Sequence, residues 1–227
     1  MLDLTVNILE KFIAGLELTG TVESLNRTAT STTLILAPDS ETYHLREKMT
    51  VIVDGKSYEV ISFEKDKQIT VEGLIKQASE YQVPNPFYFH GTPIMTNTQI
   101  NGAKPKKFPM IYLYEILRER EKRINSSIAR ESDLRLFFLD TANFEDWNTD
   151  DHYSKRLVGL NCLVDIFIEK ARENRCQFEL YETDFTRINH VNWGVFKDNR
   201  GHETKIFDEP CTGVELSFTL PLKNCFK

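Results

Sequence analysis

The sequence lacks the short motifs by which most enzymes and cofactor-binding proteins are identified. Its ten glycines are scattered singly, so it has neither a G-x-G-x-x-G turn nor a Walker pattern that would bind phosphate. The nucleophile elbow G-x-S-x-G is also absent. We therefore expect no cofactor and no enzymatic activity, although a site built from residues far apart in the chain leaves no motif.

Cysteine and histidine are too sparse and too widely spaced to indicate a metal centre. The four cysteines stand at positions 162, 176, 211 and 225 without a Cys-x-x-Cys pair, whereas zinc sites draw ligands from short, turn-compatible spacings. The five histidines fall in different predicted elements. The sequence predicts no metal site, and it predicts reduced cysteines as in a reducing compartment.

An excess of positive charge and a long apolar run are missing as well. There are 28 Lys and Arg against 34 Asp and Glu, a net charge of -6, which excludes a generic basic nucleic-acid binder. No apolar run approaches the roughly 20 residues that span a bilayer. Because no basic segment precedes the apolar residues at the N-terminus, we expect no signal peptide, no membrane contact and an intracellular protein.

Hydrophobic residues make up 41% of the 227 residues, enough for one large domain or two small ones. Helical spacing of apolar residues predicts a short helix over residues 5–14. Five short strands follow, at residues 21–25, 33–36, 49–53, 56–63 and 68–72. Asp54-Gly55 between two of them predicts a type I′ hairpin turn. This region, residues 1–83, is expected to be a helix with a small closed β-barrel of the SH3-like or OB-like kind.

Residues 84–227 are expected to form an α/β domain, which makes the whole chain α+β. Its strongest element is a long apolar helix over residues 150–173 with Thr149 as N-cap. Leu157, Leu160, Val164 and Phe167 should lie against a mixed or antiparallel sheet. Strands are predicted at residues 110–113, 134–139, 178–181, 193–196, 205–207 and 214–220. Val158, Cys162, Leu163 and Ile166 give the helix a second apolar side, so we expect it to be covered on both flanks.

Two charged regions are candidate binding surfaces. Asp140, Glu145, Asp146, Asp150 and Asp151, beside His152, suit either Mg²⁺ or Ca²⁺ or the start of a helix and a solvated or interface face; we favour the second interpretation. Residues 104–135 hold nine basic and five acidic residues, with residues 118–127 read as an exposed loop or arm. That region suits a protein interface, nucleic acid or plain solvent.

Opposite charge on these two regions leads to a hypothesis about assembly. A closed ring needs two different faces that meet between neighbouring subunits, and complementary charge fixes their register. We expect basic residues of one subunit to face acidic residues of the next. The basic set is Lys106, Lys107, Arg118, Arg120, Lys122 and Arg123, and the acidic set is Asp146, Asp150 and Asp151.

The order of elements resembles neck and tail-completion proteins of tailed bacteriophages, the tail terminators among them. The resemblance lies in residues 89–92 (FHGT), 109–113 (PMIYL), 131–138 (ESDLRLFF), 147–153 (WNTDDHY) and 213–222 (GVELSFTLPL), and it covers roughly residues 85–225. These are packing patterns rather than catalytic signatures. The β-rich part at residues 20–72 departs from a minimal tail terminator and resembles an inserted barrel.

The resemblance implies a structural virion protein, assembled in the host cytoplasm, that forms a six- or twelve-fold ring around the DNA channel. Its partners would be other neck, portal or tail-tube proteins, with non-specific contact to packaged DNA. Two alternatives stay open. One is an intracellular enzyme or ligand-binding protein with a pocket near Phe87–Thr92, and the other is a nucleic-acid-binding β-barrel protein.

Overall fold

The computed structural model describes residues 5–16, 18–38, 45, 47–64, 67–92, 108–114, 118–124, 127–174, 183–197, 203–205 and 210–222. The chain divides into two compact units. One is Gly15–Asn85, and the other combines Met1–Ala14 with Pro86–Lys227. The expected domain boundary at residue 83 lies two residues before Asn85, where the barrel unit ends. The N-terminal segment, however, belongs to the unit that contains Pro86–Lys227 and not to the barrel unit, as was expected.

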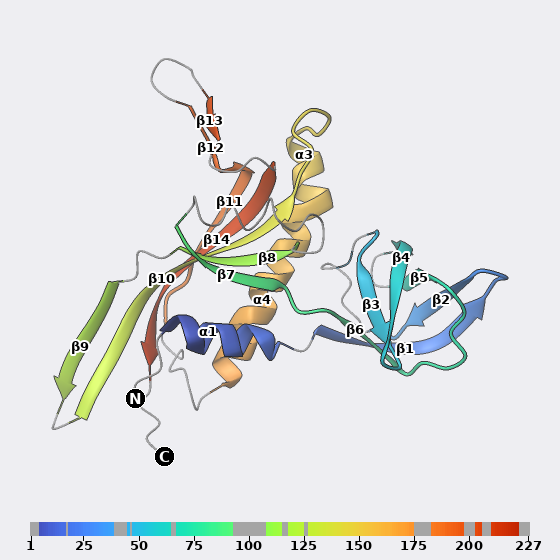
Figure 1. Ribbon diagram of the computed structural model, residues 1–227, viewed down its shortest axis with the longest axis horizontal. Coiled ribbons are helices and arrows are strands. Elements are labelled where there is room, and N and C mark those ends of the chain that lie inside the picture. The colour runs from blue at the N-terminus through green and yellow to red at the C-terminus, as the bar shows by residue number, and fades with distance from the viewer. Residues whose placement is uncertain are drawn as a thin grey trace. The chain divides into compact units, whose positions relative to one another are not determined.

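The unit Gly15–Asn85 is a closed antiparallel barrel of six strands (Figure 1). Their order around the barrel is β1-β2-β5-β4-β3-β6, with β6 closing onto β1. Alternation along the strands turns Leu34, Val51, Val60 and Ile69 inward, where they are fully buried. The strands are β1 (Leu18–Arg27), β2 (Ser31–Leu36), β3 (Thr50–Val53), β4 (Lys56–Glu64), β5 (Gln68–Glu72) and β6 (Glu80–Val83). The five predicted strands are confirmed, and β6 was missed.

The predicted hairpin turn at Asp54-Gly55 is confirmed. Val53 pairs with Lys56 across it, which leaves a two-residue loop between β3 and β4. Asp54 has φ of 51° and Gly55 of 73°, so both central residues are left-handed, as a type I′ turn requires. This turn therefore sets the register of the β3–β4 pair.

The other unit is built on a mixed sheet with the order β11-β14-β10-β8-β7. Strands β7 and β8 run parallel, while β9 and the remaining neighbours pair antiparallel. The strands are β7 (Phe87–Gly91), β8 (Met110–Tyr114), β9 (Arg118–Ile124), β10 (Ser127–Thr141), β11 (Thr186–Trp193) and β14 (Cys211–Leu222), and β12 (Val195–Lys197) pairs with β13 (Glu203–Lys205).

Most strand predictions for this unit are confirmed. Residues 110–113, 134–139 and 214–220 lie in β8, β10 and β14. The predicted strand at residues 193–196 is divided at Gly194, whose φ is 82°, between β11 and β12. Residues 178–181 lie outside the described part of the chain, as do residues 206 and 207 of the last short prediction. Residues 118–124 were read as a loop and form β9 instead.

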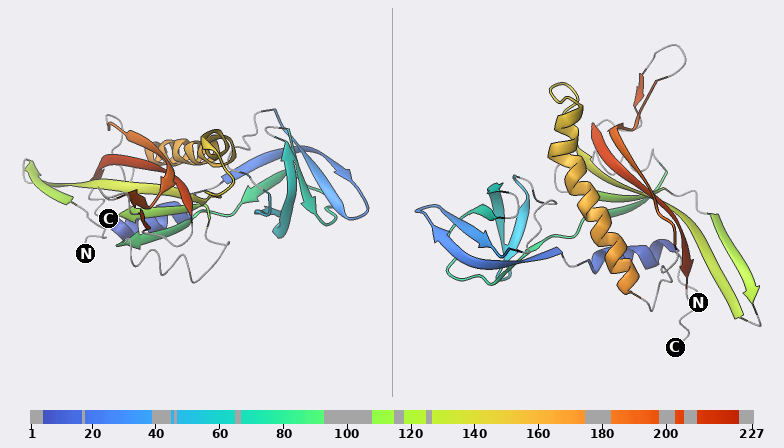
Figure 2. Two further views of the ribbon diagram at one scale, coloured as in Figure 1. Left: turned by 90° about the horizontal axis from the view of Figure 1, so that it is seen from above. Right: turned by 180° about the vertical axis from the view of Figure 1, so that it is seen from behind.

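The long helix runs along one face of the sheet (Figure 2). It consists of α3 (Thr149–His152), a π-helical turn η1 (Tyr153–Leu157) and α4 (Val158–Glu173). Leu157, Leu160, Val164 and Phe167 are buried, as predicted. The ring of Phe167 lies 5.6 Å from that of Phe138 on β10. No helix among the described residues has both the length and the apolar character that crossing a bilayer demands.

The second apolar side of this helix is only partly covered. Leu163 is buried, whereas Val158 is 43% exposed, and Cys162 and Ile166 are half-buried. The helix α1 (Thr5–Ala14) packs nearby, with the ring of Phe12 5.3 Å from that of Phe167. The helix predicted over residues 5–14 is thus confirmed, but its assignment to the barrel domain is wrong.

Candidate subunit interface

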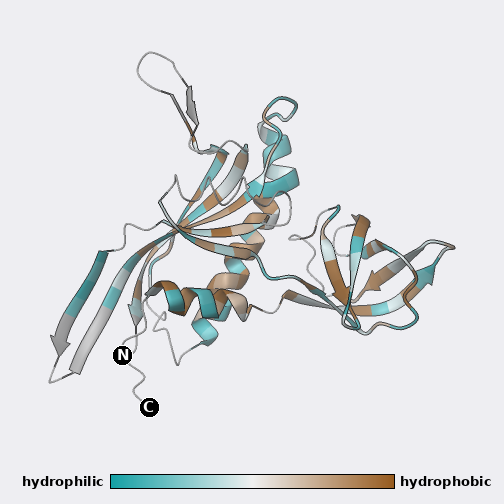
Figure 3. Cartoon of the chain, in the orientation of Figure 1, coloured by the Kyte–Doolittle hydropathy of each residue, from teal (hydrophilic) through white to brown (hydrophobic). Residues whose placement is uncertain are grey.

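A two-stranded arm extends the sheet at one end (Figure 1). It consists of β9 and residues 127–133 of β10. The described side chains of β9 are hydrophilic (Figure 3). The register sets Arg118 opposite Asp133 and Arg120 opposite Glu131, and opposite charges at such positions stabilise a strand pair. Arg120 Nη2 lies 2.8 Å from Asp133 Oδ1. Part of the arm's positive charge is therefore balanced within the arm.

This pairing corrects the sequence-based view of a basic arm. Residues 118–133 contain five basic residues and four acidic ones, so nearly all of the local excess comes from the lysines before residue 108. Of the residues in the interface hypothesis, Lys106 and Lys107 lie outside the described residues, while Arg118, Arg120, Lys122 and Arg123 all belong to β9. Among the described side chains of the arm, Arg120 and Asp133 form an ion pair.

The base of the arm is fixed to the first residue of α1. The hydroxyl of Thr5 donates to Glu119 Oε1 at 2.6 Å and lies 3.0 Å from the hydroxyl of Ser132. Ser132 in turn donates to Glu119 at 3.3 Å, and both Thr5 and Ser132 are buried. A carboxylate beside the N-terminus of a helix is electrostatically favoured. These contacts hold the direction in which the arm leaves the sheet.

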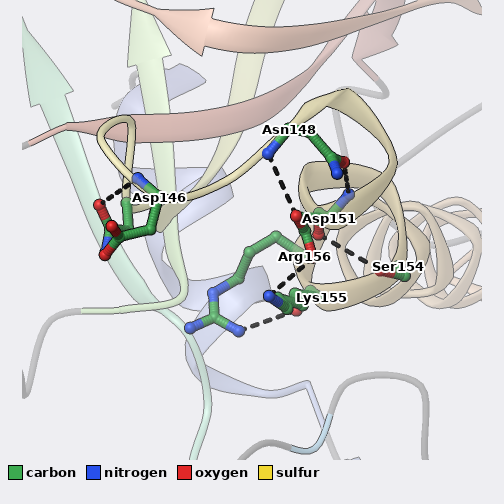
Figure 4. A network of polar contacts seen from close by, with 7 residues as sticks. Asp146, Asn148, Asp151, Ser154, Lys155 and Arg156 are labelled. Carbon is green, nitrogen blue, oxygen red and sulfur yellow. Dashed lines mark hydrogen bonds and ion pairs between the residues drawn. The ribbon is translucent and has the colours of Figure 1, made fainter.

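A second charged surface lies at the other end of β10, in residues 143–151, which we call the acidic knob (Figure 4). Asn148 Oδ1 accepts from the backbone N–H of Asp151 at 2.9 Å, and Asp151 Oδ2 accepts from that of Asn148 at 3.1 Å. This reciprocal pair is a capping box. The helix therefore begins one residue earlier than predicted, with Asn148 rather than Thr149 as N-cap.

Two of the knob's carboxylates, Asp146 and Asp151, have local partners. Asp151 Oδ1 lies 2.7 Å from Lys155 Nζ, and the hydrogen bond from Lys155 lowers the pKa of that carboxyl. Asp146 accepts from Asn143 Nδ2 at 2.6 Å, and Asp140, before the knob, pairs with Arg156 at 3.5 Å. Asp150 is exposed. In the part of the chain that the structure describes, no three His, Cys, Asp or Glu side chains come together as metal ligands would.

The arm and the knob lie at different ends of the same unit. Strand β10 joins them, and its 15 residues span about 45 Å at about 3.3 Å per residue. The basic candidates on β9 and the acidic candidates of the knob therefore do not meet within one chain. They are placed as two separate surfaces, one at each end of the same strand.

Sequence reasoning missed a buried ionic network on the face of the sheet that α4 does not cover. Glu215 on β14 is 4% exposed and accepts from Arg135 Nη2 at 3.0 Å and Nε, from His190 Nε2 at 3.0 Å and from Ser217 at 3.2 Å. Burial raises the pKa of Glu215, but these hydrogen bonds outweigh it, so the pKa lies below its usual value. The alternation of apolar and polar residues over 214–218 was the feature of the sequence that could have indicated Glu215 as a residue of the opposite face of the sheet.

The aromatic segment of the alternative pocket is strand β7. Phe87 and Phe89 pack against a buried cluster of Met110, Tyr112, Phe137, Leu139, Trp193 and Cys211. The hydroxyl of Tyr112 donates to the carbonyl of Gly91 at 2.8 Å. These side chains thus fill the space beside the sheet.

Comparison of the chain with protein-family models, with curated proteins and with solved structures finds no match.

Proposed function

We propose that this protein is a structural subunit that assembles head-to-tail into a ring, in the manner of the neck and tail-completion proteins of tailed bacteriophages. The observation that carries the proposal is where the five resembling segments lie. Residues 89–92, 109–113, 131–138 and 213–222 fall on β7, β8, β10 and β14, and residues 147–153 open the long helix. Segments scattered over more than 130 residues thus converge on one sheet and its helix.

The arm and the knob support head-to-tail assembly. A ring requires that two different surfaces of the subunit meet, and the two ends of β10 carry surfaces of different chemistry. One is a ribbon with Arg118 and Arg120 along β9, and the other presents Glu145, Asp146 and Asp150. In the proposed ring the arm of one subunit lies against the knob of the next.

The internal pairing of buried charges also favours a structural role. Glu215, Asp140 and His152 are buried ionisable residues, and each is hydrogen-bonded or ion-paired to neighbouring strands or helices. Removing one partner of such a pair leaves a buried group uncompensated and is strongly destabilising. In this proposal the protein acts as a virion component without catalysis or cofactor.

Charge on the barrel argues against nucleic acid as its main partner. Residues 15–85 hold seven basic and eleven acidic residues, and binding to phosphates depends on an excess of Lys and Arg. We propose instead that the barrel contacts another protein of the neck, portal or tail. Contact of the ring with packaged DNA would fall to the lysines before residue 108.

Native mass spectrometry of the purified full-length chain tests the proposal. We expect a closed oligomer of six or twelve copies, populated more strongly at low salt. A monomer at all protein and salt concentrations would contradict it. A monomer that binds a small molecule would instead favour the ligand-binding alternative.

A further inference from the structure

His152 joins the acidic knob to the body of its unit. It is the last residue of α3 and is 2% exposed. The centroid of its ring lies 5.7 Å from that of Phe144 and 5.4 Å from that of Trp147, both of which belong to the knob. On the side of the sheet, His152 Nδ1 is 2.7 Å from the hydroxyl of Thr212 on β14.

The position of the imidazole proton follows from the partner of Thr212. The Thr212 hydroxyl donates its single hydrogen to the carbonyl of Val191 on β11 at 2.6 Å. Its oxygen must therefore accept from His152, so the proton of the neutral ring is on Nδ1. The resulting chain from His152 through Thr212 to Val191 connects the knob with two strands of the sheet.

The surroundings disfavour a second proton on this ring. Charged groups that face it are Asp151 and Lys155, on its own helix, while β14 and β11 contribute a neutral hydroxyl and a carbonyl. Lys155 and Arg156 already lie 5.1 Å from the centroid of Trp147. A charged imidazole would add a third cation close to Lys155 and Arg156, at a buried position. Burial accordingly lowers the pKa of His152, and the attraction of Asp151 opposes this less strongly.

We propose that His152 is a pH-sensitive latch, whose neutral ring holds the knob against β14 and whose protonation releases the knob while the sheet and α4 stay folded. Release is local because α4 has its own buried contacts through Leu160 and Phe167. The π-helical turn η1 separates α3 from α4, and such turns inside helices often occur at functional sites. This inference does not depend on ring assembly.

Hydrogen exchange of the full-length protein, corrected for intrinsic rates at pH 7.5 and pH 5.5, tests the latch. When the knob is open, His152 should have the ordinary histidine pKa of about 6.5. The population of molecules with an open knob should therefore rise by up to about tenfold from pH 7.5 to pH 5.5. We expect exchange in residues 142–157 to rise accordingly, with little change in the barrel. His152→Asn keeps a donor near the Nδ1 position and cannot be charged, so its exchange should not depend on pH. His190→Asn, the matched control, should respond like the wild type.

Equal protection of the wild type at both pH values would overturn the proposal, and so would a pH response that persists in His152→Asn. If that variant does not fold, an NMR titration of the wild-type His152 ring decides. A ring that titrates in step with the knob amides supports the latch. Knob amides that change while the ring stays neutral, or a ring that titrates without them, overturn it.

Discussion

Gly55 adopts a backbone conformation that few other residues tolerate. Its φ is 73°, and a Cβ added there would meet nothing within 4 Å, so any cost of substitution arises in the backbone alone. A left-handed residue other than glycine costs roughly 1–2 kcal/mol. We expect Gly55→Val to lower the free energy of unfolding of the barrel by about that amount, and Gly55→Asn by less, because Asn enters this region more readily.

The two tryptophans make this measurement specific. Trp147 and Trp193 are the only ones in the sequence, and both lie in the unit that contains Pro86–Lys227. Chemical denaturation followed by circular dichroism should show a shift for Gly55→Val, while the tryptophan fluorescence transition stays in place. A Val variant as stable as the wild type would refute the role of the turn.

Phe167 on α4 packs against both α1 and the sheet. Its ring contacts those of Phe12, Phe138 and Phe218 at centroid distances of 5.3, 5.6 and 6.5 Å. Removing a buried phenylalanine side chain costs on the order of 3–5 kcal/mol. We expect Phe167→Ala to lower stability by this amount in tryptophan fluorescence, and half-buried Ile166→Ala to do so clearly less. Equal effects of the two changes would contradict this account.

At the scale of elements, regular periodicity was the part of the fold that the sequence predicted well. The helices and the barrel strands with alternating apolar residues were found within a few positions. Strand β9 was not, because its residues are almost all charged and only the partner strand β10 reveals that they pair. The N-cap was misplaced by one residue because Asn148 and Thr149 are both competent caps.

Long-range contacts explain the remaining errors. The apolar face of α1 fits any apolar partner, so nothing in residues 5–14 indicates that Phe12 packs on Phe167, 155 positions later. The candidate interface residues were found from charge alone. The separation of those on β9 from those of the knob, at the two ends of β10, required the sheet topology. The ion pair between Arg120 and Asp133 depends on strand register, which a single sequence does not provide.

The assignment of α1 to the second unit gives a direct prediction. Phe12→Ala removes a buried ring contact with Phe167, so it should lower the denaturation midpoint seen by tryptophan fluorescence. Glu10→Ala, an exposed change on the same helix, is the matched control. If Phe12→Ala instead shifts only the barrel transition, α1 belongs with the barrel.

The link between β11 and β14 should be acid-sensitive. The pKa of Glu215 is lowered in the folded protein from its ordinary value of 4.5, so the unfolded chain binds the proton more readily below that pH. Its stabilisation is thus present above pH 4.5 and lost as the pH falls through the folded pKa. We expect urea denaturation between pH 7 and pH 3 to show that the free energy of unfolding falls less steeply below pH 4.5 in Glu215→Gln than in the wild type. The decline in the free energy of unfolding just below pH 6.5, which we attribute to His152, should be the same in this variant. If Glu215→Gln declines below pH 4.5 as steeply as the wild type, the prediction is contradicted.

At the scale of the whole molecule, the knob allows a charge reversal that spares the fold. Asp151 belongs to the capping box, so Glu145→Lys with Asp150→Lys is the better test, since both residues are exposed. We expect this variant to lose the ring at low salt, where charge pairs act most strongly. Lys122→Glu with Arg123→Glu on the arm should partly restore it. An unchanged oligomer in native mass spectrometry would refute the arm-to-knob interface.

The position of the barrel between α1 and β7 has a consequence for synthesis on the ribosome. All six barrel strands lie between residues 18 and 83, so the barrel is complete before any strand of the other sheet has emerged. At about 5–20 residues per second, α1 waits roughly 8–30 seconds for Phe167. During that interval Phe12, which the finished protein buries, lacks the aromatic ring against which it packs, so the apolar face of α1 stays open to chaperones and to aggregation.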